Sequence, residues 1–113
     1  MSRSWKVIAV DFDGTLCMDG FPNTEGGKPN VNLFAELIAL RKRGNKVILW
    51  TCRGGKSLQE AVEFCRWNGL EFDGINENIP EALEAVAFDH EPRKVFADIY
   101  IDDQSVKPRW REE

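Results

Sequence analysis

Short apolar runs alternate along this chain with longer segments of helical periodicity. The pattern predicts strands at 5–10, 46–51, 71–75 and 95–101, and helices at 31–43, 54–69 and 80–88. The segment 46–51 is apolar on successive residues from 47 to 50, which is typical of a strand covered on both faces. We therefore expect an α/β fold, a Rossmann-like three-layer sandwich with a mainly parallel central sheet and helices on both faces.

The chain of 113 residues is long enough for a single domain, which we expect to span 1–113. The segment 17–30 is polar and rich in glycine, and it predicts a loop. Larger inserted domains have no room elsewhere, so we expect no cap over the edge of the sheet.

Composition limits the function classes that need to be considered. No apolar run approaches the roughly 20 residues that a membrane span needs, and the N-terminal residues lack the features of a signal peptide. We expect a cytoplasmic protein that does not bind membranes. The net charge of −4, with short basic clusters only at 41–43 and 107–111, argues against broad nucleic-acid binding. One histidine and three unpaired cysteines offer too few soft ligands for zinc, which leaves a hard cation on oxygen ligands.

Two acidic residues leave the end of the first predicted strand. Asp11 and Asp13 follow the apolar run and are separated by Phe12. Because side chains alternate along an extended chain, both carboxylates are expected on one side and Phe12 on the other. Two carboxylates in one small volume repel each other, and a divalent cation would relieve the repulsion. The alternative is an acidic turn that merely closes the strand, since Asp-Gly is a common turn dipeptide.

Other polar residues follow two further predicted strands. Thr51 and Arg53 come after the second strand, and Asp102 and Asp103 come after the last. In an open α/β sheet, ligands bind beyond the carboxyl ends of the strands where the strand order reverses, so these groups should meet. Carboxylate oxygens, a backbone carbonyl and water are ligands that suit Mg²⁺.

These residue types fit phosphoryl transfer. A carboxylate can attack a phosphate that a metal polarises, forming an aspartyl-phosphate, and a second acid can handle the protons. We assign the attack to Asp11 and the proton transfers to Asp13. A hydroxyl and a cation are needed to hold the phosphoryl oxygens, and Thr51 and Lys94 fit those roles. Arg93 adjoins Lys94 and is the alternative for the cation.

The ordered pattern resembles the haloacid dehalogenase (HAD) superfamily, and specifically its short, capless phosphatase-like members. The resemblance covers nearly the whole chain and rests on Asp11-Phe12-Asp13-Gly14-Thr15-Leu16, Thr51, Lys94 and Asp102-Asp103. It implies a Mg²⁺-dependent phosphatase with Asp11 as nucleophile, Asp13 as general acid and base, and Thr51 and Lys94 as phosphate holders. It further implies magnesium ligands from Asp11, from Asp13 through its carbonyl, and from Asp102. Gly14, Arg53 and Asp103 complete the implied site as supporting or substrate-contacting residues.

The substrate and two competing functions stay open at this point. A site without a cap suits a bulky phosphorylated end, on a nucleic acid or a phosphoprotein, or a small molecule enclosed by a neighbouring subunit of a homo-oligomer. Arg53 could grip a substrate phosphate or pair with an acid such as Asp102. The alternatives to an enzyme are a phospho-accepting receiver-like signalling domain and a HAD-like module that only binds a partner. In receivers the acid pair usually follows the first strand and the accepting aspartate a later one, whereas here the Asp11-x-Asp13 pair comes first and Asp102-Asp103 last.

Overall fold

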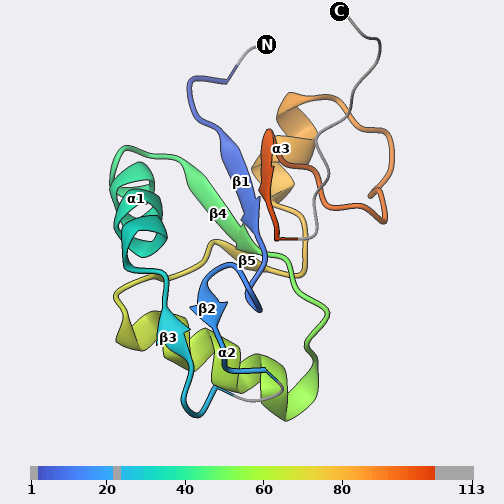
Figure 1. The fold of residues 1–113 in the computed structure, drawn as a ribbon. Coiled ribbons are helices and arrows are strands. Elements are labelled where there is room, and N and C mark those ends of the chain that lie inside the picture. The colour runs from blue at the N-terminus through green and yellow to red at the C-terminus, as the bar shows by residue number, and fades with distance from the viewer. Residues whose placement is uncertain (1–2, 22–23, 104–113) are drawn as a thin grey trace, which may run out of the picture.

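The central sheet has four parallel strands in the order β5-β4-β1-β6 (Figure 1). The computed structural model describes residues 3–21 and 24–103, so residues 22–23 of the predicted loop and the basic cluster at 107–111 lie outside it. The strands are β1 (Val7–Val10), β4 (Lys46–Leu49), β5 (Gly74–Ile75) and β6 (Ile99–Ile101). The chain runs outward from β1 in both directions, so the strand order reverses at β1.

Helices cover both faces of this sheet, which confirms the predicted fold class. They are α1 (Val31–Lys42), α2 (Gly55–Trp67) and α3 (Pro80–Ala85). Ile8 and Val10 of β1 belong to the larger apolar cluster, which includes buried residues of α1 and α2. Val7 and Ala9 point the other way, into a smaller cluster with Ala82 of α3. Alternation along β1 therefore builds a core on each face of the sheet.

Several elements are shorter than the sequence predicts, and β6 shows why. The carboxylate of Asp98 accepts the Val7 N–H at 2.8 Å and a bidentate pair of hydrogen bonds from Arg3, each 2.8 Å long. Its side chain thus takes a place that a backbone carbonyl would occupy in the ladder, and regular pairing starts only at Ile99. Similarly, α3 ends at Ala85, and Ala87 adopts a left-handed backbone with φ of 62°.

The 17–30 segment contains regular structure where a loop was expected. Strand β2 (Cys17–Met18) pairs antiparallel with β3 (Lys28–Pro29). This small ribbon lies beyond the carboxyl ends of the parallel strands (Figure 1). Between β1 and α1, the described regular structure consists of β2 and β3, which together are far smaller than a domain. Among the described helices, none is long and apolar enough to cross a bilayer.

Candidate functional site

A tight turn after β1 presents Asp11 and Asp13 together. The Phe12 carbonyl accepts the N–H groups of Leu16 at 2.9 Å and Cys17 at 3.0 Å, which folds the chain back on itself. Phe12 is fully buried, and its ring meets that of Phe64 edge-on at 5.6 Å. Phe12 thus packs toward α2, while Asp11 and Asp13 both line the cavity described below.

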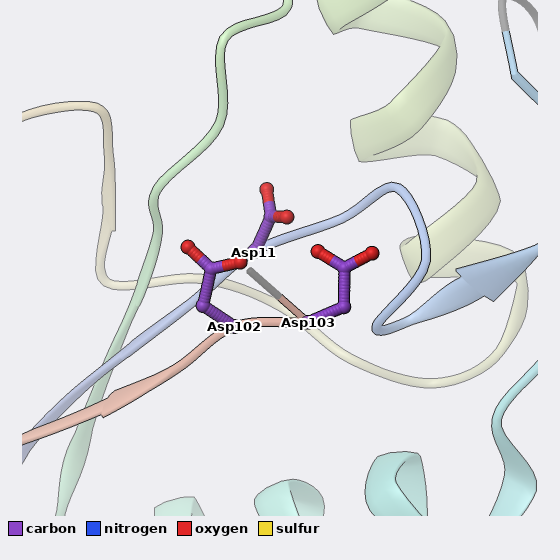
Figure 2. A group of neighbouring side chains, drawn as sticks. All are labelled: Asp11, Asp102 and Asp103. Atoms are coloured by element: carbon purple, nitrogen blue, oxygen red, sulfur yellow. The ribbon is translucent and has the colours of Figure 1, made fainter. Parts of the chain in front are cut away.

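The carboxylates of Asp11, Asp102 and Asp103 form a compact cluster (Figure 2). One oxygen from each residue lies within 4.8 Å of the others. The cluster arises because β1 and β6 are neighbours in register, and the Asp11 N–H donates to the Ile101 carbonyl at 2.9 Å. Asp103 therefore lies among the acids themselves, where sequence reasoning had given it only a supporting role.

Burial and mutual repulsion both act on Asp11. Loss of solvent around the carboxyl is the main reason that its pKa rises from 3.8 to about 6. A hydrogen bond with the Phe12 backbone opposes this rise, while the negative charges of Asp102, Asp103 and Asp13 add to it. The ionised form of Asp11 is therefore destabilised in the folded protein.

A cavity of about 610 Å³ lies at this edge of the sheet. Its lining joins groups from the ends of β1, β4 and β6 with residues at the tip of the β2–β3 ribbon: Asp11, Asp13, Gly14, Cys17, Asp19, Gly20, Phe21, Thr51, Cys52 and Asp103. The predicted convergence of strand ends therefore occurs for Asp11, Asp13, Thr51 and Asp103. Among the described residues that line the cavity, none is Lys or Arg.

Asp13 lines the cavity but pairs with Arg53. Arg53 Nε donates to Asp13 Oδ2 and Nη2 donates to Oδ1, each at 2.8 Å. This hydrogen bonding raises the pKa of the Arg53 guanidinium. The sequence left open whether Arg53 grips a substrate phosphate or pairs with an acid such as Asp102. The structure shows pairing with an acid, and that acid is Asp13.

Lys94 lies apart from the other predicted site residues in this structure. Its ammonium sits 4.8 Å from the centroid of the Tyr100 ring on β6, and the side chain is exposed. Neither Lys94 nor Arg93 lines the cavity. The structure thus brings the acids and Thr51 together, and it leaves the predicted phosphate-holding cation outside the group.

Sequence reasoning missed residues that line the cavity or support its lining. Asn76 follows β5 in a left-handed conformation with φ of 54°, and its side-chain oxygen accepts the Thr51 N–H at 2.8 Å. The available signal was its position, since Asn76 is a polar residue directly after the predicted strand at 71–75. Asp19 and Phe21 were assigned only to a loop, yet both line the cavity.

Gly14 is required at its position by two independent constraints, and this yields a prediction. Its φ is +77°, and a Cβ there would overlap the Asp103 carboxylate. We expect Gly14→Ala to lose about 1 kcal/mol of unfolding free energy for the backbone conformation, and in addition to displace Asp103 and weaken divalent-cation binding. Thermal unfolding and Mg²⁺ titration measure the two effects.

Gly26 provides the matched control for this substitution. Its φ of +79° is nearly the same, but no atom lies within 4 Å of the point that a Cβ would occupy. Gly26→Ala should therefore carry the backbone cost alone. Equal cation affinity in the two variants would show that Asp103 does not depend on the space beside Gly14.

Comparison with known proteins adds one structural relative. No protein-family description matches the sequence, and no curated protein matches it. A solved structure of a conserved protein from Bacteroides thetaiotaomicron is similar, with 37% sequence identity and a TM-score of 0.76. The alignment covers 94% of this chain and 84% of the Bacteroides chain. This chain therefore belongs to the same family as that conserved Bacteroides protein.

Proposed function

We propose that this protein is a Mg²⁺-dependent phosphatase, a phosphoric monoester hydrolase that works through an aspartyl-phosphate. The observation that carries the proposal is the convergence of Asp11, Asp13 and Thr51 on one cavity, with the three-carboxylate cluster at its edge. These groups come from three separate strand ends. An acidic turn that only closes β1 would not need polar groups from the ends of β4 and β6 beside it.

The donor set fits a hard divalent cation. The cluster consists of carboxylate oxygens, which Mg²⁺ prefers. Burial is the main cause of the raised pKa of Asp11, and the neighbouring acids add a repulsion that a cation would relieve. Asp11 and Asp102 would hold the ion, with the Asp13 carbonyl and Asp103 as further oxygen donors. When bound, Mg²⁺ would neutralise charge on the phosphate and the acids. Such neutralisation is needed because the described residues that line the cavity include several acids and neither Lys nor Arg.

The first half-reaction uses Asp11 and Asp13. A carboxylate oxygen of Asp11 attacks phosphorus, and the ester P–O bond breaks as the aspartyl-phosphate forms. Asp13 gives a proton to the departing oxygen, so an alcohol leaves. Thr51, whose backbone is held by Asn76, is placed to donate its hydroxyl to a phosphoryl oxygen.

The second half-reaction restores the enzyme. Asp13 is now a carboxylate and accepts a proton from water as the water oxygen attacks phosphorus. The bond to Asp11 breaks, inorganic phosphate is released, and Asp13 is again protonated. An acid two residues from the nucleophile favours such turnover over the storage of a phosphoryl group by a receiver-like domain.

The proposal is tested by phosphate release with and without Mg²⁺. The panel should contain an aryl phosphate, phosphorylated metabolites, nucleotides, 3′- and 5′-phosphorylated oligonucleotides and a phosphopeptide, because a site without a cap suits small and large substrates alike. We expect Mg²⁺-dependent turnover of at least one class. A stable phosphorylated protein without turnover would favour the receiver-like alternative, and no reaction with any compound would favour a binding module.

Asp102→Ala should weaken Mg²⁺ binding directly. Partners that merely orient metal ligands typically contribute about 10- to 100-fold to affinity, so loss of a ligand should cost at least about tenfold. Asp102 is exposed, and its removal should leave the fold intact. Isothermal titration calorimetry of Mg²⁺ measures the change. Asp89→Ala removes an exposed acid outside the cluster and should bind Mg²⁺ as the wild type does.

A further inference from the structure

The Arg53 guanidinium contacts the lining of the cavity at Asp13. The Asp13 side chain is 25% exposed and lines the cavity, whereas the Arg53 side chain is 3% exposed and is absent from the lining. The guanidinium grips both carboxylate oxygens. Arg53 is therefore placed to act on a neighbouring catalytic group and not on a bound phosphate.

Other contacts hold the guanidinium itself in place. Nη1 donates to the Ser57 carbonyl in the first turn of α2 at 3.0 Å. The guanidinium carbon lies 4.8 Å from the centroid of the buried Phe12 ring. The backbone N–H of Arg53 donates to Thr51 Oγ1 at 3.2 Å, which fixes the start of the side chain. Because the guanidinium is planar and is held by these contacts, its two hydrogen bonds to Asp13 also fix the plane of that carboxylate.

The pairing leaves a further hydrogen-bonding position on each carboxylate oxygen of Asp13. Each carboxylate oxygen can accept more than one hydrogen bond, and Arg53 uses one position on each. The Asp13 carboxylate that Arg53 grips also lies apart from the carboxylates that would hold the cation. Asp13 is only two residues from Asp11, yet its carboxylate is outside the cluster formed with Asp102 and Asp103.

We propose that Arg53 is the positioning residue for Asp13, orienting its carboxylate toward the leaving group and keeping it apart from the cation-binding acids. This inference rests on the phosphatase function proposed above. It assigns to Arg53 an effect on the proton-transfer step, with no direct contact to the phosphate.

The test compares two esters that differ in their need for a general acid. The leaving group of 4-nitrophenyl phosphate departs readily without a proton, whereas that of benzyl phosphate requires one. With saturating Mg²⁺, we expect Arg53→Met to lower kcat for benzyl phosphate about 10²-fold and to lower that for 4-nitrophenyl phosphate by less than about tenfold. Arg53→Lys keeps a cation but cannot grip both oxygens, so its kcat for benzyl phosphate should be intermediate.

Two further variants separate positioning from a structural role. Adding Arg53→Met to Asp13→Asn should cause little further loss on benzyl phosphate, because both substitutions remove the same proton transfer. Arg41→Met is the matched control, since Arg41 grips Asp73 in the same bidentate manner with bonds of 3.0 and 2.9 Å away from the cavity. Its kcat should stay at the wild-type value for both esters.

Equal losses on both esters, an effect confined to KM, or additive losses in the double variant would overturn the positioning role. If Arg53→Met does not fold, the same ester comparison on Arg53→Lys and Arg53→Gln decides the matter. A wild-type protein that hydrolyses neither ester with Mg²⁺ would instead reject the phosphatase proposal itself.

Discussion

Replacing Asp11 with Asn should remove phosphate release and, at the same time, stabilise the metal-free protein at pH 7. Loss of an essential nucleophile can cost about 10⁴- to 10⁶-fold in turnover, so the residual rate should be close to background. The gain in stability has a separate cause, which is the burial of Asp11 beside other acids. A residue that is merely part of an acidic turn would not combine these two effects.

The sign of the stability effect follows from the raised pKa. Between pH 3.8 and about 6, the folded protein holds a proton on Asp11 that the unfolded chain has released. Asp11 therefore makes the free energy of unfolding fall as pH rises through this window. The full rise in pKa corresponds to roughly 3 kcal/mol. Solvent screening of a half-buried group reduces the expected gain in Asp11→Asn to about 1 to 2 kcal/mol at pH 7.

Urea unfolding between pH 4.5 and 7.5, with a chelator present, measures this effect. The wild-type protein should lose stability relative to Asp11→Asn as pH rises, and Mg²⁺ should restore it more strongly at pH 7 than at pH 5. Asp98→Asn is a useful control, because hydrogen bonding to Arg3 lowers the pKa of Asp98 and its ionised form is favoured. That variant should be less stable than the wild type. A stability difference between wild type and Asp11→Asn that does not change with pH would contradict the electrostatic account of Asp11.

Asp13→Asn should lower turnover by about 10²- to 10⁴-fold while changing Mg²⁺ affinity little. The reason is that the side chain of Asp13 would transfer protons, whereas any contribution to the cation would come from its backbone carbonyl. The carboxylate pairs with Arg53 and lies outside the three-acid cluster, which supports this division. Some stability should also be lost, since a buried guanidinium would face a neutral amide.

Steady-state kinetics and Mg²⁺ titration on the same preparation test the division of roles. Asp19→Asn is the control, because Asp19 is an acid that also lines the cavity but does not belong to the three-acid cluster. We expect Asp19→Asn to retain turnover within about tenfold, well short of the loss expected for a general acid. Equal losses of turnover and Mg²⁺ affinity in Asp13→Asn would assign its carboxylate to the metal instead.

The layered fold was predictable because its signals are local. Continuous apolar runs identify β1 and β4, and helical periodicity ending at Gly44 and Gly69 identifies α1 and α2 almost to the residue. Boundaries that depend on distant partners were less predictable. The late start of β6 depends on the bonds of Asp98 to Arg3 and Val7, which lie more than 90 positions away. The β2–β3 ribbon has strands of two residues each, too short for any periodicity to mark.

The candidate site divides along the same line. The sequence alone identified Asp11, Asp13, Thr51 and the Asp102-Asp103 pair, because a parallel sheet must bring the carboxyl ends of its strands to one edge. Which side chains then pair was decided only in three dimensions. Arg53 pairs with Asp13, Asp103 joins the acid cluster, and Lys94 lies over Tyr100. Strand ends are set by periodicity and topology, whereas the direction of each side chain depends on packing and charge from residues distant in the sequence, which no local pattern contains.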